Sequence, residues 1–497
     1  MKFELPTSSS PEQIQDLLHR FARLAGAHLS ESESGEVPVY QAHTPEELRA
    51  TIEMRPRDEG RNLEELFEEL DKILKLSVRT SHPRFANHLF VGSDLSGILG
   101  EWVTALLDST MATYEMSSVS TVMERELIAE MCDLAGFDGG EGLFTPGGSI
   151  SNLMAVAVAR DHYFPNARVR GMAGEELPAI FTSSEAHYSL SRAANILGLG
   201  LDSIFPVDVD EVGRILPQSL KEEIEKARAM GRKPFFVCAT AGTTVACAYD
   251  PIDEIAEICA QEDLWLHVDG AYGGAVLLSQ KHQGLMKGIE KADSMTWCPH
   301  KMMGVPVVCS AFLARRQGQL QSALAVDADY IFHPGMETLN LGPMSLQCGR
   351  RIDAIKVWMA WQFRGRRGME EQIDRFFDQA QFFADQIRSR PHFELLREPE
   401  GANIVFHYIP PALRDQPEGE ERKEALDKAT RKIREAVKER GEVLVNYGPI
   451  DGYASFRMVT INPRTTEEDL LAFLDEIQEA GDALYPAIDA HVELKVS

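Results

Sequence analysis

The chain has 497 residues, of which 50 are lysine or arginine and 77 are aspartate or glutamate, so its net charge is −27. Such an acidic chain opposes non-specific binding to nucleic acid or to anionic membranes. Its 44% hydrophobic and 26% charged content is typical of a soluble globular protein, and no stretch approaches the roughly 20 uninterrupted apolar residues of a membrane span.

The first of three predicted regions, residues 1–95, is helical by pattern and strongly acidic, with four glutamates between positions 64 and 69. Two interpretations remain open: a solvated helical face, or an N-terminal arm that takes part in a dimer. Residues 1–6 lack the apolar core of a signal sequence.

Residues 96–375 alternate between apolar strands and amphipathic helices, which predicts the large domain of an α/β protein. We expect parallel strands at 178–182, 235–240 and 264–269. Between the last two, Asp250 and Pro251 predict the start of a helix, with the aspartate as its N-cap and the proline as its first residue. A strand, a helix and a strand at this spacing form a βαβ unit.

Residues 376–497 have a different pattern again, which predicts a small α+β domain. Antiparallel strands are expected at 393–396, 403–409 and 455–461. Charged helices are expected at 420–440 and 466–483, the second of them capped by Thr465 or Thr466.

The seven cysteines are scattered along the chain, without a CxxC pair and without the spacing of a metal site. An odd number of cysteines, mostly in apolar runs, favours reduced thiols in the core of a cytoplasmic protein. We therefore expect a cytoplasmic location and no metal centre.

One carboxylate and one lysine indicate the chemistry. The apolar run 264–269 ends at Asp269, and Lys301 follows about thirty residues later in a polar turn. A buried parallel strand would bring this carboxylate to the sheet edge where open α/β sheets bind ligands. Pyridoxal phosphate (PLP) catalysis uses both groups, because a lysine forms the Schiff base and a carboxylate keeps the pyridine nitrogen protonated. Taken alone, the two residues also fit a surface lysine and an ordinary strand-end aspartate.

Three further segments place polar groups at the same predicted edge. The sequence TPGGSISN at 145–152 opens a helix, whose free N–H groups and Ser149 hydroxyl can bind a phosphate, although an ordinary helix cap is the alternative. His187 follows a strand and can stack on a flat cofactor or simply cap a helix. Thr243 and Thr244 end another strand, where their hydroxyls can reach a phosphate or a ring oxygen.

These segments are part of a wider resemblance. Over roughly residues 75–475 the chain resembles the group II PLP-dependent amino-acid decarboxylases, above all the glutamate, cysteine sulfinate and aspartate decarboxylases. The resemblance rests on SHPRF at 81–85, TYE at 113–115, TPGGSISN at 145–152, ATAGTT at 239–244, HVD at 267–269, PHKMMGVP at 299–306, LQCGR at 346–350 and FRM at 456–458. So many motifs in order are specific to the family and much less specific to a substrate.

The resemblance implies the aspartate-aminotransferase-like fold type I, PLP as the cofactor, and a homodimer with active sites at its interface. By position, it makes Lys301 the Schiff-base lysine and Asp269 the partner of the pyridinium nitrogen. The other roles that it implies are ring stacking for His187, phosphate binding for Gly148 and Ser149, cofactor contacts for Thr244 and Ala271, phosphate binding or proton transfer for His300, and binding of the substrate α-carboxylate for Arg457.

Two departures from the family pattern concern binding. Cys298 stands where the family commonly has asparagine, so a weak hydrogen-bond donor replaces a strong one near the phosphate and looser anchorage is expected. Phe90 matches the cysteine sulfinate pattern rather than the small residue of the glutamate enzymes, and would shorten the substrate pocket. His88 replaces a glutamine, either as a neutral donor or as a charge for an acidic side chain.

A third departure concerns proton transfer. The family carries a tyrosine in a mobile loop that protonates Cα, whereas no tyrosine lies between Phe332 and Leu346 here. Another acid, His333 or His187, then serves, or the outcome changes, because loss of this tyrosine in relatives is associated with oxidative deamination to an aldehyde.

These observations predict a homodimeric PLP-dependent decarboxylase of a small acidic L-amino acid, without nucleic-acid or membrane partners. L-Aspartate and 3-sulfinoalanine rank above L-glutamate as substrates. The alternatives are a decarboxylation-coupled aldehyde synthase, a decarboxylase of a non-acidic amino acid, and a catalytically silent PLP-binding protein.

Overall fold

The computed structural model describes residues 10–487 except Ser93, Asp327, Asp329, Pro334, Met336 and Glu337. The chain divides into two compact units. Unit 1 is made of the described parts of Met1–Gly92, Asp385–Leu395 and Phe406–Ser497, and unit 2 of those of Ser93–Ala384 and Leu396–Val405. The first and the third of the three predicted regions therefore lie mostly in the same compact unit.

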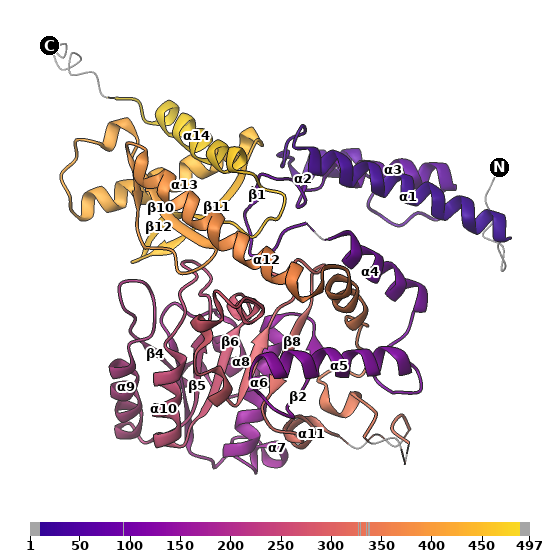
Figure 1. Ribbon diagram of the computed structural model, residues 1–497, viewed down its shortest axis with the longest axis vertical. Helices are drawn as coiled ribbons and strands as arrows, with labels where there is room; N and C mark the ends of the chain where they lie inside the picture. The colour runs from indigo at the N-terminus through magenta and orange to yellow at the C-terminus, as the bar shows by residue number, and fades with distance from the viewer. Residues whose placement is uncertain are drawn as a thin grey trace. The chain divides into compact units, whose positions relative to one another are not determined.

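Unit 2 is built on a seven-stranded mixed sheet with the strand order β2-β8-β7-β6-β5-β3-β4 (Figure 1). Its strands are β2 Glu141–Thr145, β3 Leu177–Ser183, β4 Ile204–Val207, β5 Arg232–Thr240, β6 Trp265–Gly270, β7 Ser294–Trp297 and β8 Ser310–Ala314. From β4 to β7 neighbouring strands are parallel, whereas β8 pairs antiparallel with both β7 and β2. All residues of β6 are buried, as a parallel strand covered on both faces requires. The predicted α/β fold with a mainly parallel sheet is confirmed.

The helices of unit 2 are α4 Leu95–Leu107, α5 Ser118–Leu134, α6 Gly148–Tyr163, α7 Ala167–Arg170, α8 Ser189–Ile196, α9 Pro217–Ala229, α10 Ile252–Glu262, α11 Gln319–Leu324 and most of α12 Ala354–Ser389. Short 3₁₀ helices are η1 Leu201–Ser203, η2 Gly273–Leu278, η3 Gln283–Met286, η4 Ile289–Lys291 and η5 Gly342–Met344. The core between α6, α8 and the sheet contains Val156, Ile180 and Phe236, which are fully buried. This packing fixes the start of α6 against the strands.

Helix α10 begins without the predicted aspartate cap, and this prediction was wrong. Its N-cap is Pro251 rather than Asp250. The Asp250 carboxylate accepts hydrogen bonds from the backbone N–H groups of Thr240, at 2.6 Å, and Ile215, at 2.7 Å. Burial raises the pKa of Asp250 to about 7. The side chain ties the end of β5 to a neighbouring loop, because both N–H groups are buried and need an acceptor.

Unit 1 contains the sheet with the order β1-β11-β12-β10-β9, of which β10 begins in residues that belong to unit 2. Its strands are β1 Phe85–Ala86, β9 Phe393–Leu395, β10 Asn403–Tyr408, β11 Leu444–Ile450 and β12 Tyr453–Val459, and its C-terminal helices are η6 Pro411–Leu413, α13 Glu420–Arg440 and α14 Glu467–Leu484. β9 pairs antiparallel with β10, and β11 with β12, whereas β1 is parallel to β11. The three predicted strands and both predicted helices are present; β1 and β11 were missed.

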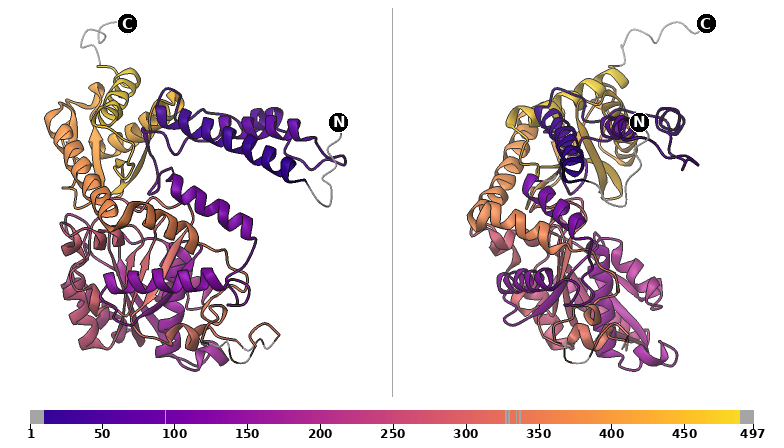
Figure 2. Two further views of the ribbon diagram at one scale, coloured as in Figure 1. Left: turned by 45° about the vertical axis from the view of Figure 1, so that its right-hand side comes forward. Right: turned by 90° about the vertical axis from the view of Figure 1, so that its right-hand side faces the viewer.

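The N-terminal part of unit 1 is helical, as predicted, with α1 Pro11–Ser34, α2 Pro45–Thr51 and α3 Leu63–Leu76. α1 and α3 run alongside each other (Figures 1 and 2), and Arg20 on α1 pairs with Glu64 on α3 at 2.7 Å. Each helix starts with a capping box, at Ser10, Thr44 and Asn62. Across residues 10–487, with the six gaps named above, no helix is long and apolar enough to cross a membrane.

Candidate active site

A cavity of about 280 Å³ lies in unit 2 where β5 and β6 end and where α6 begins. The segments that line it follow β2, β3, β5, β6 and β7, so the carboxyl ends of several strands converge on one place. Of the predicted site residues, the cavity is lined by Gly148, Ser149, His187, Thr244, Asp269, Ala271, His300 and Lys301. Other lining residues include Asn152, Thr240 and Tyr272.

Asp269 is held at the end of β6 by two donors. One carboxylate oxygen accepts a hydrogen bond from the Asn152 side-chain amide at 2.8 Å, and the other from the backbone N–H of Ala271 at 3.1 Å. Only 6% of Asp269 is exposed. A buried carboxylate with both oxygens engaged keeps a fixed orientation and offers its remaining lone pairs to a cationic donor in the cavity.

Lys301 stands in a turn that the backbone closes on both sides. Its N–H donates to the carbonyl of Cys298 at 3.0 Å, and its carbonyl accepts from the N–H of Gly304 at 3.0 Å. The side chain lines the cavity, with Nζ 5.9 Å from the ring centroid of Tyr272. The amine and the Asp269 carboxylate therefore face the same cavity.

The start of α6 leaves room for a ligand group. Gly147, the N-cap, has φ of 107°, which favours glycine. A Cβ added to Gly148 would lie 3.2 Å from Cys298 Sγ and 3.3 Å from Ala271 Cβ, so a side chain there would crowd this end of the cavity. The first N–H groups of a helix have no partner within it, and here they adjoin the Ser149 hydroxyl.

Cys298 lies against this helix start but does not line the cavity itself. Its thiol donates a hydrogen bond to the Ser310 hydroxyl at 3.2 Å, and the residue is 1% exposed. Burial raises the pKa of the Cys298 thiol. All seven cysteines are free, and all but Cys348 are buried.

His187 lies in the segment that connects β3 to α8, and it lines the cavity. Its Nδ1 accepts a hydrogen bond from the backbone N–H of Ser189 at 3.2 Å, so a neutral ring carries its proton on Nε2. Burial lowers the pKa of His187, and the charge of Lys301 acts in the same direction, whereas Asp269 opposes them. The imidazole is therefore mainly neutral near pH 7.

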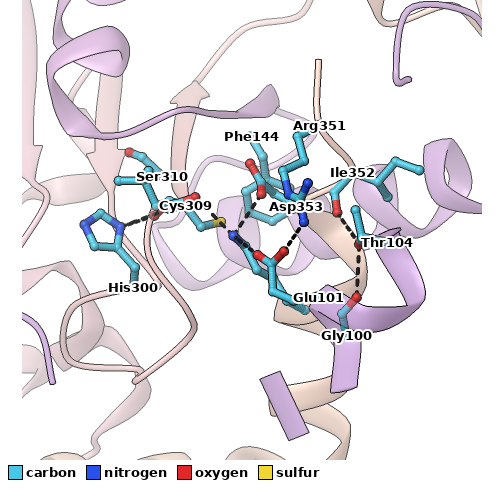
Figure 3. A network of polar contacts seen from close by, with 12 residues as sticks. Gly100, Glu101, Thr104, Phe144, His300, Cys309, Ser310, Arg351, Ile352 and Asp353 are labelled. Atoms are coloured by element: carbon cyan, nitrogen blue, oxygen red, sulfur yellow. Dashed lines mark hydrogen bonds and ion pairs between the residues drawn. The ribbon is translucent and has the colours of Figure 1, made fainter. Parts of the chain in front are cut away.

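His300 is anchored to a segment that a buried ion cluster holds in place (Figure 3). Its Nδ1 lies against the backbone carbonyl of Cys309, and burial lowers the pKa of His300 to about 4. Lys356, 1% exposed, donates to the carbonyl of Val308 at 3.1 Å and pairs with Glu101 at 2.6 Å and Asp353 at 3.0 Å. Burial lowers the pKa of Lys356, but Asp353 and Glu101 outweigh it and raise the pKa overall. Val308 lines the cavity, so the cluster fixes one wall of it.

The loop after β5 forms another wall. The Asn403 side-chain amide donates to the carbonyls of Thr244 and Val245, both at 3.1 Å, and its oxygen accepts from the Tyr272 hydroxyl at 2.8 Å. Thr240 lines the cavity with a buried hydroxyl that has no hydrogen-bond partner among the residues that the structure describes. An orphaned buried hydroxyl beside a cavity is what a polar ligand would satisfy.

The three predicted substrate-binding residues belong to unit 1. Arg457, on β12, is 6% exposed and donates from Nη2 to the backbone carbonyl of Asn87 at 2.8 Å. The Asn87 side-chain amide lies 2.8 Å from Nδ1 of His88, whose ring centroid is 5.4 Å from that of Phe90. Partial burial, followed by the charges of Arg457 and Arg434, lowers the pKa of His88, although the residue remains exposed. A neutral His88 fits the donor interpretation.

The loop after Phe332, in which the family's tyrosine is missing, lies partly outside the described residues, because Pro334, Met336 and Glu337 are among the gaps. His333 is described and exposed. Sequence reasoning missed the contributions of Asn152, Thr240, Tyr272 and Asn403. Asn152 ends the quoted motif TPGGSISN and Thr240 lies in the quoted motif ATAGTT, and these two positions were the available signals. Asn403 lies more than one hundred residues from its partners, so no local pattern reveals it.

The residues of the cavity fit PLP. The buried Asp269 carboxylate suits a cationic ring nitrogen, the Lys301 amine suits an aldehyde, and the start of α6, which a Cβ at Gly148 would crowd, suits a phosphate. On this sheet, these features define the class of fold type I PLP-dependent enzymes.

Similarity to known proteins narrows this class to one family. The pyridoxal-dependent decarboxylase conserved domain matches residues 45–409, and the chain belongs to this family. The chain is 39% identical over 448 residues to mouse (Mus musculus) acidic amino acid decarboxylase GADL1, which covers 89% of this chain and 82% of that protein. The human (Homo sapiens) GADL1 is also 39% identical, covering 89% of this chain and 86% of that protein.

The crystal structure of mouse CSAD superimposes with a TM-score of 0.92 at 36% identity, covering 95% of this chain and 99% of that one. The predicted resemblance and the predicted fold type I are therefore confirmed. The protein is a PLP-dependent amino-acid decarboxylase with PLP as its cofactor.

Proposed function

We propose that the protein removes the α-carboxylate of a small acidic L-amino acid as carbon dioxide and releases the amine. L-Aspartate and 3-sulfinoalanine are the favoured substrates, ahead of L-glutamate. The observation that carries the proposal is that a buried carboxylate, Asp269, and a lysine, Lys301, line one cavity. The acidic substrate is supported by relatives that are named acidic amino acid decarboxylases.

Bound PLP supplies an electron sink for the electron pair that the departing carboxylate leaves at Cα. Lys301 would hold the cofactor covalently through its amine, which lines the cavity. Asp269 keeps the ring nitrogen protonated, and its two hydrogen bonds hold the carboxylate in place while it does so. The low dielectric of a buried site strengthens this ion pair.

The start of α6 would hold the phosphate with backbone N–H groups of Gly148 and Ser149 and with the Ser149 hydroxyl, and Thr244 and His300 line the same cavity. Ala271, which lines the cavity, would contact the ring. The Cys298 thiol donates to Ser310 rather than into the cavity, which supports weaker phosphate anchorage than an asparagine would give.

His187, which lines the cavity, would stack on the cofactor ring and would deliver the proton to Cα of the substrate. The bond from the Ser189 N–H to Nδ1 orients the ring and leaves the proton of the neutral form on Nε2. Because the lowered pKa keeps the ring neutral near pH 7, His187 must first take up a second proton at Nδ1, in place of the Ser189 bond, before Nε2 gives its proton to Cα and the ring returns to the neutral form. A histidine of this kind can act as acid and base near neutral pH.

Substrate selection is assigned to unit 1. The planar guanidinium of Arg457 binds the α-carboxylate, Phe90 limits the length of the side chain, and His88 donates a hydrogen bond to the acidic group. The burial of Arg457 supports this role, because charge-assisted bonds are strongest away from water.

We further propose a cytoplasmic homodimer with active sites at its interface. α4 presents Leu95, Leu99, Val103 and Leu106 to solvent, and this helical spacing places them along one apolar face. Seven free thiols support a reducing compartment. Sedimentation velocity should give a dimer, and Leu99→Glu combined with Val103→Glu should give a monomer; a wild-type monomer would contradict the proposal.

The decisive test is a substrate panel. Purified protein with PLP is assayed for carbon dioxide and amine with aspartate, 3-sulfinoalanine, glutamate, cysteate, 2,4-diaminobutyrate and aromatic amino acids. We expect kcat/KM to be highest for aspartate or 3-sulfinoalanine. A preference for a non-acidic substrate would contradict the proposal, and no turnover of any substrate would favour a catalytically silent role.

The absence of a tyrosine between Phe332 and Leu346 favours one second candidate, a decarboxylation-coupled aldehyde synthase. This activity consumes one oxygen per substrate and forms peroxide, ammonia and an aldehyde in place of the amine. An oxygen electrode run beside the amine assay separates the two. Stoichiometric oxygen uptake by the unmodified enzyme would establish the second candidate.

A further inference from the structure

Behind Asp269, buried side chains form a continuous chain of hydrogen bonds into the interior of unit 2. The Trp265 indole Nε1 donates to Ser294 Oγ at 2.9 Å, and Ser294 Oγ lies 2.8 Å from His267 Nδ1. His267 Nε2 lies 3.1 Å from Asn152 Oδ1, and Asn152 Nδ2 donates to Asp269 at 2.8 Å. No more than 2% of any of the four residues behind Asp269 is exposed.

Chemistry fixes the direction of every bond in this chain. The Asp269 carboxylate only accepts, so the Asn152 amide must face it with Nδ2 and present Oδ1 to His267. Oδ1 also only accepts, so His267 must carry its proton on Nε2. Burial lowers the pKa of His267 to about 4, so near pH 7 Nδ1 has no proton and accepts from Ser294.

The far end of the chain is compatible with the same direction. An indole N–H can only donate, so Ser294 accepts from Trp265 and has its own proton left for His267. Thr296 also donates to Asn152 Oδ1, at 2.8 Å, which holds the amide in the same orientation. All the bond dipoles thus point their positive ends toward the carboxylate.

The Asn152 amide also joins two proposed cofactor contacts. Its Nδ2 donates to Ser189 Oγ at 2.8 Å as well as to Asp269, and the backbone N–H of Ser189 donates to His187 Nδ1. A single buried amide therefore sets the orientation of the carboxylate and contacts the residue that orients the imidazole. Buried networks of this kind are effective because each aligned bond polarises the next one.

We propose that Trp265, Ser294, His267 and Asn152 form a directional relay that positions and polarises Asp269, with Asn152 and His267 as its main positioning residues. The proposal rests on the proposed role of Asp269 at the ring nitrogen. The relay stabilises the ionised carboxylate and so keeps the ring nitrogen protonated, and its influence falls with each bond away from Asp269.

The test measures the ring nitrogen directly, by nitrogen-15 NMR of the enzyme reconstituted with PLP labelled at that atom. We expect the resonance to move toward that of the unprotonated ring in the order Asn152→Leu, His267→Phe, Trp265→Phe. His267→Gln should resemble the wild type, because a glutamine amide can donate to Asn152 and accept from Ser294. Decarboxylation should fall about tenfold in His267→Phe, as is typical when a supporting hydrogen bond behind a functional group is lost.

Trp297→Phe is the matched control, because Trp297 is a fully buried tryptophan on the neighbouring strand, and its indole N–H has no partner within the described part of the chain. Asp269→Asn distinguishes failure of the relay from failure of the proposed role of Asp269. If Asp269→Asn leaves the resonance unchanged, the proposed role of Asp269 fails. If Asp269→Asn moves it but His267→Phe does not, the relay is overturned. Should His267→Phe not fold, an unshifted resonance in Trp265→Phe overturns the relay equally.

Discussion

The two compact units hold their candidate charged groups in different ways. In unit 2, Asp269 is oriented by a side-chain amide and a backbone N–H, with buried neutral groups behind the amide. In unit 1, Arg457 is equally buried and donates to a backbone carbonyl, that of Asn87, whose neighbour His88 is exposed. Asp269 is thus supported by a side-chain amide as well as by the backbone, and Arg457 is held in part by a backbone carbonyl.

This difference predicts which substitutions each unit tolerates. A substitution behind Asp269 disturbs several buried bonds at once, so the chemistry of unit 2 tolerates little variation. Around Arg457, the segment 87–90 carries an exposed histidine and a half-buried phenylalanine, both of which a single substitution can replace at low cost. We therefore expect unit 2 to fix the reaction and unit 1 to tune the substrate.

The largest effect expected is that of Lys301→Ala, because only an amine in the cavity can bind the cofactor covalently. Activity should fall by at least about 10³-fold, as is typical when a covalent catalytic group is removed, and the absorption band of the lysine-bound cofactor should disappear. Lys281→Ala, at an exposed lysine paired with Asp378, is the control and should keep both. Borohydride reduction followed by peptide mass spectrometry should place the cofactor on Lys301, and a label on another lysine would refute the assignment.

A smaller loss, about 10²–10⁴-fold in kcat, is expected for His187→Gln, because glutamine cannot act as a general acid. The variant should still bind PLP, release amine slowly and show either a long-lived coloured species after decarboxylation or oxygen uptake with peroxide. His333→Gln serves as the comparison, since His333 is exposed. A larger loss in His333→Gln would transfer the proton donor to the loop.

Phe90→Ser probes unit 1 and should change specificity rather than chemistry. If Phe90 shortens the pocket, glutamate turnover should rise relative to aspartate or 3-sulfinoalanine by at least about tenfold in the kcat/KM ratio, since one methylene in an apolar pocket contributes about 1–3 kcal/mol. The absorption of the bound cofactor should stay unchanged. An unaltered ratio would show that length is selected elsewhere, with His88→Gln as the next variant.

The smallest effect concerns acid and the buried histidines of unit 2. Burial lowers the pKa of both His267 and His300 to about 4, below the value of about 6.5 in an unfolded chain. The unfolded state then binds more protons at these two histidines between these values, so their contribution to stability falls as the pH drops from about 6.5 to 4. The raised pKa of Asp250, about 7, acts in the opposite direction, so the histidine effect is measured as a difference between two proteins. Between pH 7 and pH 5, the melting temperature of the wild type should fall by about one or two degrees relative to that of His300→Gln. Equal slopes in the two proteins would contradict the shifted pKa of His300.

Much of the site could be predicted from the sequence because its residues follow strands whose apolar character is a local property. The run before Asp269 is buried along its whole length, and His187 and Thr244 follow other strands of the same sheet. Parallel strands bring their carboxyl ends to one edge, so these side chains meet there. The cap assigned to Asp250 failed because the local pattern of α10 contained no information about the distant N–H group of Ile215.

The sequence by itself determined which chemical groups the protein offers and on which edge of the sheet they lie, since strand burial and helix starts depend on neighbouring residues. Only the tertiary structure decided their partners. Asn152 meets Asp269 across 117 positions of the chain, and Asn403 meets Tyr272 across 131. Such contacts depend on how strands and helices pack, and the direction of the bonds behind Asp269 follows only when all of its donors and acceptors are in place.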